Sequence, residues 1–140
     1  MAFACVQNAG RSQMAAAFAE RELDRRNAGD RIEVLTGGTR PADHVHDVVV
    51  EAMRELDIDI GDRTPREVTP EELRSADLVV TMGCSASDVC PATWNGESRD
   101  WGLDDPHGRP VEAVREIRDE IEDRVVALFD ELLPERPPAE

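Results

Sequence analysis

The residues whose types and spacing could do chemistry begin with the segment Cys5-Val-Gln-Asn-Ala-Gly-Arg11-Ser12. A loop between a strand and a helix can point its backbone N–H groups at a tetrahedral oxyanion. Arg11 can then fork onto two of the anion's oxygens. The helix N-terminus and Arg11 both favour the thiolate of Cys5, to which Ser12 can donate a hydrogen bond. The oxyanion-binding residues we expect are Val6, Gln7, Asn8, Ala9, Gly10, Arg11 and Ser12.

Two other interpretations of this segment remain open. A buried cysteine followed by a surface arginine arises by chance, because Cys-x5-Arg alone is a weak pattern. A dinucleotide site is disfavoured, because no Gly-x-Gly-x-x-Gly follows the expected strand.

A candidate general acid lies in Asp104-Asp105-Pro106. Attack by a thiolate on an oxyanion requires a proton for the leaving oxygen, and a nearby carboxylic acid can supply it. The alternative is a simple turn, which needs no function in a chain with 31 acidic residues.

The remaining cysteines, Cys84 and Cys90, are six residues apart. Six residues of α-helix rise about 9 Å, which exceeds the roughly 7 Å between Cα atoms that a disulfide tolerates. If the segment is helical when reduced, a disulfide requires it to unwind, as in a redox switch that a partner dithiol reduces. Two inert cysteines and a zinc pair are the alternatives, although the spacing is uncommon for zinc and His44, His46 and His107 offer no clear second pair.

The elements that must position these residues alternate between strand and helix. Apolar periodicity predicts strands at 3–6, 32–35, 78–82 and 99–101, and helices at 11–27, after Asp47 as N-cap, from Thr69 as N-cap, and at 111–132. Such alternation indicates an α/β fold, a three-layer sandwich with a central four-stranded parallel sheet and helices on both faces. Ligands bind beyond the carboxyl ends of such strands, where the three chemically suggestive segments are expected to meet.

The length of 140 residues suits a single domain, which we expect at 1–133, with a disordered tail at 134–140. The net charge of −15 argues against nucleic-acid and anionic-membrane partners. No apolar run approaches the roughly 20 residues of a membrane span. The first five residues lack a basic region and a long apolar stretch, so we expect no signal peptide and a cytoplasmic protein.

All 16 basic residues are arginine. An acidic, lysine-free surface is typical of a halophile, where salt reduces the Debye length to about 3 Å. Codon bias toward arginine is the alternative. The odd count of three cysteines argues against a structural disulfide framework.

Together, several motifs carry a family resemblance. They are Cys5 to Met14, Gly38-Thr39-Arg40-Pro41-Ala42, Met82-Gly83-Cys84, Cys90-Pro91 and Trp101-Gly102-Leu103-Asp104-Asp105-Pro106. From Phe3 to Leu133 the chain resembles arsenate reductases built on the low-molecular-weight protein tyrosine phosphatase fold, of the thioredoxin-coupled type. The pair Cys84 and Cys90 is what points to the reductases.

The resemblance implies a thiol relay without metal or cofactor. Cys5 attacks arsenate and Asp105 protonates the departing oxygen. Cys84 then attacks Cys5 and releases arsenite, and Cys90 moves the disulfide to Cys84–Cys90. The implied partners are arsenate, with phosphate or sulfate as mimics, and thioredoxin or a similar dithiol, with a monomer expected.

The resemblance leaves two alternatives. A low-molecular-weight phosphatase acting on aryl phosphates needs only Cys5, Arg11 and Asp105, although the absence of tyrosine counts against phosphotyrosine as its substrate. A non-enzymatic oxyanion-binding or redox-sensing protein is the other. His44 and His46 are expected in solvation or helix capping, and Trp101 in packing.

Overall fold

The computed structural model describes residues 1–5, 8–29, 32–38, 40–67, 69–76, 78–81, 97–101 and 108–132. Several predictions made above lie outside these residues. They concern Val6, Gln7, Cys84, Cys90, Asp105, and the tail at 134–140.

The described strands form one parallel sheet in the order β2-β1-β3-β4. Their bounds are Ala2–Cys5 for β1, Leu35–Gly38 for β2, Leu78–Thr81 for β3 and Glu97–Asp100 for β4. Cys5 pairs with Gly38, and Thr81 pairs with Asp100. The last residues of all four strands therefore lie at the same edge of the sheet, where residues after each strand can meet.

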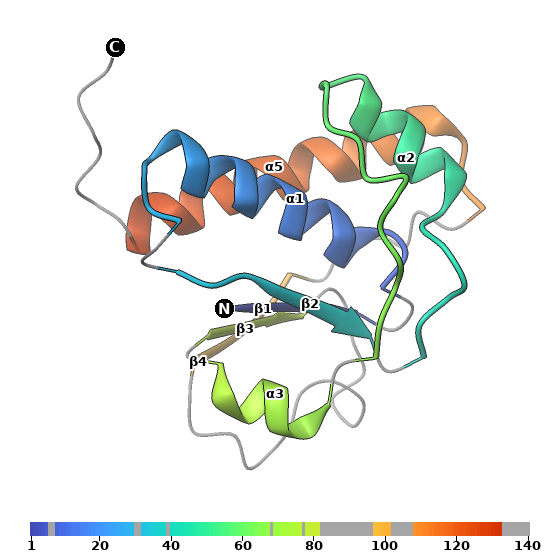
Figure 1. The fold of residues 1–140 in the computed structure, drawn as a ribbon. Helices are drawn as coiled ribbons and strands as arrows, with labels where there is room; N and C mark the ends of the chain where they lie inside the picture. Colours follow the sequence, from blue (N-terminus) through green and yellow to red (C-terminus); the bar gives the residue numbers. More distant parts are fainter. Residues whose placement is uncertain are drawn as a thin grey trace.

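The described helices are α1 (Arg11–Arg25), α2 (Asp47–Arg54), α3 (Pro70–Ser75) and α5 (Val111–Leu132). Figure 1 shows α1, α2 and α5 on one face of the sheet and α3 on the other. Helix α1 packs on β1 and β2, and α5 packs against both α1 and α2. The predicted α/β architecture, with a parallel sheet between helices, is confirmed.

The core lies between the sheet and the first helix layer. Helix α1 buries four alanines, Ala15, Ala16, Ala17 and Ala19. These small side chains leave room for the large ones, of which Phe3, Phe18, Phe129 and Met14 are fully buried. Trp101 is buried with its ring centroid 6.0 Å from that of Phe3, which confirms the predicted packing role.

The second strand differs from its prediction. It begins at Leu35, where the prediction ended, because β1 pairs with Leu35–Gly38 and not with the apolar run before it. Ile32 and Val34 instead pack, half-buried, against the core as the chain approaches the sheet. Glycine is a poor strand former, so Gly37 and Gly38 concealed this strand.

Two helix ends also differ from prediction. Helix α1 ends at Arg25, not Asn27, because Asn27 has a φ of 54° and closes a Schellman motif. In that motif the Ala28 N–H donates to the Leu23 carbonyl over 2.8 Å. His46 occupies the N-cap position of α2, so the prediction of Asp47 is wrong by one residue, and no side-chain hydrogen bond from His46 caps this helix.

The third helix has its predicted capping box. The Thr69 N–H donates to Glu72 Oε1 over 3.0 Å, and the Glu72 N–H donates to Thr69 Oγ1 over 3.1 Å. This reciprocal arrangement satisfies two backbone donors at the helix start. Among the helices that the structure describes, none combines the length and apolar character that crossing a bilayer requires.

Candidate active site at the end of strand β1

Cys5 is the last residue of β1 and is only 3% exposed. Its sulfur accepts the backbone N–H of Asn8 over 3.2 Å and lies 2.9 Å from Ser12 Oγ. The strand thus delivers the thiol to the edge of the sheet, and the start of α1 brings a hydroxyl to it. Cys5 and Ser12, predicted to act together, are in contact.

Asn8 fixes the geometry around this thiol. It is fully buried with a φ of 52°, a left-handed conformation that asparagine tolerates better than most residues. Its Oδ1 lies 3.0 Å from the backbone nitrogen of Arg66. A backbone N–H can only donate, so the oxygen of the Asn8 amide must face Arg66. Gln13 Nε2 donates to the same oxygen over 3.1 Å.

The orientation of this amide sets the direction of two further hydrogen bonds. Asn8 Nδ2 donates to Ser12 Oγ and to Thr36 Oγ1, each over 2.8 Å. Each hydroxyl therefore accepts from Asn8 and keeps its own proton for another acceptor. Thr36 Oγ1 lies 3.0 Å from the Phe3 carbonyl.

For Ser12 the acceptor in contact is the Cys5 sulfur. When Cys5 is a thiolate its sulfur has no proton, so Ser12 is the donor over the 2.9 Å contact while it accepts from Asn8. Two donors, a hydroxyl and a backbone N–H, thus converge on one sulfur and stabilise negative charge there. We call the side chains of Cys5, Asn8, Ser12, Gln13 and Thr36 the Asn8 network.

The rest of the described loop completes the cradle. Ala9 is fully buried, and its carbonyl accepts the His46 N–H over 2.9 Å, which ties the loop to the start of α2. Gly10 is the N-cap of α1, with a φ of −143°, so among the described residues of the loop the left-handed conformation is that of Asn8. Arg11 is half-buried as the first residue of α1.

Sequence reasoning missed Thr36, Gln13 and Arg66 as members of this site. Thr36 is 28 residues from Asn8, and the misplaced second strand put it in a loop. Gln13 is only 2% exposed, but a glutamine in the first turn of a helix does not by itself predict a buried hydrogen-bonding role. Arg66 contacts Asn8 through its backbone N–H, and a contact of this kind cannot be predicted from the residue type.

The electrostatics beside the loop involve Arg66 and Glu72. The Arg66 guanidinium pairs with Glu72 Oε2 at 2.5 Å and donates to the Thr36 carbonyl over 3.1 Å. The Thr69 N–H and then the Arg66 guanidinium lower the pKa of the Glu72 carboxyl. Glu72 therefore remains ionised and able to hold Arg66.

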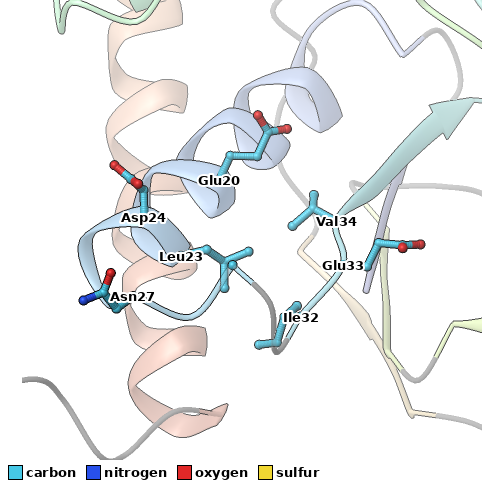
Figure 2. A pocket seen from close by; sticks show the side chains of 8 residues that line it. Glu20, Leu23, Asp24, Asn27, Ile32, Glu33 and Val34 are labelled. Atoms are coloured by element: carbon cyan, nitrogen blue, oxygen red, sulfur yellow. The ribbon is translucent and has the colours of Figure 1, made fainter.

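A hollow of about 600 Å³ lies elsewhere, between the second half of α1 and the segment before β2. Figure 2 shows Glu20, Asp24 and Glu33 at its rim with Leu23 and Ile32 between them. Because β2 starts there, the hollow lies at the opposite end of the sheet from Cys5. Its carboxylates repel an oxyanion. Within the described ranges, no three His, Cys, Asp or Glu side chains gather in a way that could hold a metal.

Comparisons with known proteins agree with this geometry. The family model described as low molecular weight phosphotyrosine protein phosphatase matches residues 1–137. A Halobacterium salinarum protein, provisionally named arsenate reductase, is 60% identical over 133 residues, covering 95% of this chain and 92% of that protein. Its halophilic source agrees with the prediction from the acidic, lysine-free composition.

Solved structures show the same fold. The thioredoxin-dependent arsenate reductase of Corynebacterium glutamicum matches with a TM-score of 0.76 and 35% identity, over 96% of this chain and 62% of that longer one. An arsenate reductase in its phosphate-binding state matches with a TM-score of 0.78 and 29% identity, over 93% of this chain and 95% of that one. The chain therefore belongs to the low molecular weight phosphotyrosine protein phosphatase family.

Proposed function

We propose that this protein reduces arsenate to arsenite, with Cys5 as the nucleophile and Cys84 and Cys90 as a resolving pair. The observation that carries the proposal is the Cys5 sulfur, buried at the end of β1 with Ser12 and the Asn8 N–H aimed at it. The similarity to a relative provisionally named arsenate reductase supports the choice of substrate.

In the first step Cys5 and arsenate form a sulfur–arsenic bond. The thiolate attacks arsenic while the N–H groups of the loop and Arg11 bind the oxygens. One arsenic–oxygen bond breaks, and Asp105 gives the departing oxygen a proton so that it leaves as water. Ser12 stabilises the Cys5 thiolate before it attacks arsenic. It does so again when this thiolate is released as a leaving group.

In the second step two electrons reach arsenic from sulfur. Cys84 attacks the Cys5 sulfur, forming a sulfur–sulfur bond as the sulfur–arsenic bond breaks. The electron pair of that bond goes to arsenic, which leaves as arsenite. Cys90 then attacks Cys84, which frees the Cys5 thiolate and leaves a Cys84–Cys90 disulfide.

An external dithiol completes the cycle by reducing that disulfide with two electrons. We propose a thioredoxin-type donor, because one similar solved structure is named as a thioredoxin-dependent arsenate reductase. A compartment that keeps cysteines reduced suits this cycle, so we place the protein in the cytoplasm, acting as a monomer.

A phosphatase is the second candidate, and the matching family model is the observation that favours it. Phosphate and arsenate are both tetrahedral oxyanions, so the loop alone does not choose between them. A phosphatase needs Cys5, Arg11 and Asp105 and has no use for Cys84.

The Cys84→Ser variant separates the two candidates. With arsenate and excess dithiol, we expect this variant to lose steady arsenate reduction while the wild type continues. If arsenate reduction is undetectable in both proteins and aryl phosphate hydrolysis is equal, the protein is a phosphatase. Tight phosphate binding without either activity would instead indicate an oxyanion-binding or redox-sensing protein.

A further inference from the structure

We propose that Arg66 is a positioning residue for the Cys5 nucleophile, held in place by Glu72 at the start of α3. This inference rests on the proposed function, in which Cys5 attacks the oxyanion. It identifies a part of the molecule outside the loop and its helix that governs the reactivity of the thiol.

Arg66 contacts three separate parts of the molecule. Its backbone N–H donates to Asn8 Oδ1 over 3.0 Å, and its backbone carbonyl accepts the Gly38 N–H over 2.9 Å. Its guanidinium donates to the Thr36 carbonyl over 3.1 Å and pairs with Glu72. Arg66 therefore joins the loop that holds Asn8, strand β2 and helix α3.

Glu72 is itself held firmly. Its Oε1 accepts the Thr69 N–H in the capping box, while its Oε2 binds the Arg66 guanidinium. The carboxylate is thus shared between the helix cap and the arginine, and its side chain is 28% exposed. The Arg66 side chain is 45% exposed, but the capping box holds the Glu72 carboxylate in place, so less ordering is needed than for two mobile side chains.

The consequence for Cys5 follows from the direction of the hydrogen bonds. The Arg66 N–H keeps the Asn8 oxygen turned away from Ser12, so that Ser12 accepts from Asn8 and its proton is available to the Cys5 thiolate. If Arg66 moves away, the Asn8 amide can turn over and offer its oxygen to Ser12. The Ser12 proton then goes to Asn8, and the sulfur loses a donor.

Gln13 limits the size of this effect. Its Nε2 donates to the same Asn8 oxygen over 3.1 Å, so one of the two donors remains when Arg66 is displaced. We therefore expect a partial loss of thiol reactivity, not an abolition. The Arg66 backbone N–H is present in every variant, which also keeps the loss partial.

The test measures Cys5 alkylation by iodoacetamide as a function of pH, at high potassium chloride. Cys84→Ser and Cys90→Ser in the background leave Cys5 as the only thiol of the three. In this background Arg66→Gln and Glu72→Gln are expected to slow alkylation at pH 7 about three- to tenfold. The pH of half-maximal alkylation is expected to rise, and the double variant to match either single one.

Arg63→Gln is the matched control. Arg63 lies three residues earlier on the same segment, where its guanidinium pairs with Glu20 of α1 at 2.8 Å. It is expected to keep the wild-type profile. Arg66→Lys, which keeps the charge opposite Glu72, is expected to recover most of the rate.

Three outcomes would overturn the proposal. Unchanged profiles for Arg66→Gln and Glu72→Gln beside a shifted Ser12→Ala profile would show that Arg66 does not position the thiol. An equal shift in Arg63→Gln would indicate general loosening of the segment. An unchanged Ser12→Ala profile would show that Ser12 does not donate to Cys5.

Failure of the proposed function is recognised separately. Alkylation requires no arsenate, so a wild-type protein that leaves arsenate unreduced still reports on Arg66. Thermal unfolding accompanies each variant, and Arg66→Lys and Glu72→Gln carry the test if Arg66→Gln does not fold.

Discussion

Two polar regions of the molecule are held together in opposite ways. Four side chains of the Asn8 network are buried and Thr36 is half-buried, and none of the five is a carboxylate or a basic group. The Glu55 cluster, formed by Glu55, Arg115 and Arg118, joins α2 to α5 near the surface through charged groups. Both regions connect segments far apart in the sequence.

The Glu55 cluster has several partners for each charge. Glu55 pairs with Arg115 at 2.6 Å and with Arg118 at 2.8 Å. Arg118 also donates to the Ala52 carbonyl over 2.8 Å and contacts Asp119. Solvent reaches Glu55, so water replaces a lost partner.

The Asn8 network has no such replacement. Its hydrogen bonds depend on one another, and turning over the Asn8 amide would change the direction of the bonds to Ser12 and Thr36. The difference shows why the site is the more sensitive region. The uncharged Asn8 network fixes the direction of its hydrogen bonds. In the Glu55 cluster, where Glu55 and Arg115 are partly exposed, the loss of one ion pair is tolerated more easily.

Replacing Asn8 is expected to have the largest effect. Asn8→Ala removes donors from Ser12 and Thr36 and leaves buried groups unpaired, so the free energy of unfolding is expected to fall by about 3 kcal/mol. Alanine also tolerates the φ of 52° poorly. Urea unfolding in high salt measures the change.

Asn8→Gly is the matched control, because glycine tolerates this backbone and removes the same side chain. The difference between the two variants isolates the backbone contribution. If both variants unfold like the wild type, the buried network does not stabilise the fold, and the comparison with the Glu55 cluster fails.

Replacing Ser12 is expected to affect reactivity more than stability. Ser12→Ala removes one donor from the Cys5 sulfur and is expected to slow its alkylation about tenfold. Ser75→Ala is the control, since the Ser75 side chain is exposed and its hydroxyl donates to the Glu71 carbonyl within α3. Equal rates of Cys5 alkylation in the two variants would show that Ser12 does not affect the reactivity of Cys5.

Replacing Thr36 is expected to have a smaller effect. Thr36→Val keeps the shape but loses the acceptor for Asn8 Nδ2, which is expected to lower the free energy of unfolding by about 1–2 kcal/mol. Thr64→Val, at an exposed position, is expected to change little. A loss as large at Thr64 would argue against a special role for Thr36.

Replacing Glu55 is expected to have the smallest effect at neutral pH. Hydrogen bonds from Arg115 and then Arg118 lower the pKa of Glu55 from 4.5 to about 2. Since the folded pKa is lowered, the contribution to stability is complete above about pH 4.5 and is lost as the pH falls toward 2.

The matching measurement follows the unfolding midpoint of Glu55→Gln and wild type from pH 7 to pH 3. The variant is expected to be slightly less stable at pH 7, with the difference shrinking below pH 4.5. A difference that grows in acid would contradict the assigned sign. A loss at pH 7 larger than that of Thr36→Val would reverse the order of the two regions.

The sequence predicted the element order and placed Cys5 at the end of a strand with Ser12 at the start of the next helix, because apolar periodicity is a local signal. It misplaced β2, since Leu35–Gly38 is a strand only through its pairing with β1. It also missed Arg66, whose backbone N–H reaches Asn8 from 58 residues away. A local sequence pattern does not identify the partner of a backbone group that bonds to a residue far away in the sequence.

The most direct test of the reductase is a single turnover. Fully reduced protein is mixed with arsenate in high potassium chloride without a recycling reductant, and lost thiols and released arsenite are counted. The account predicts that each chain loses two of its three thiols and releases one arsenite. Unchanged thiols with no arsenite would contradict it.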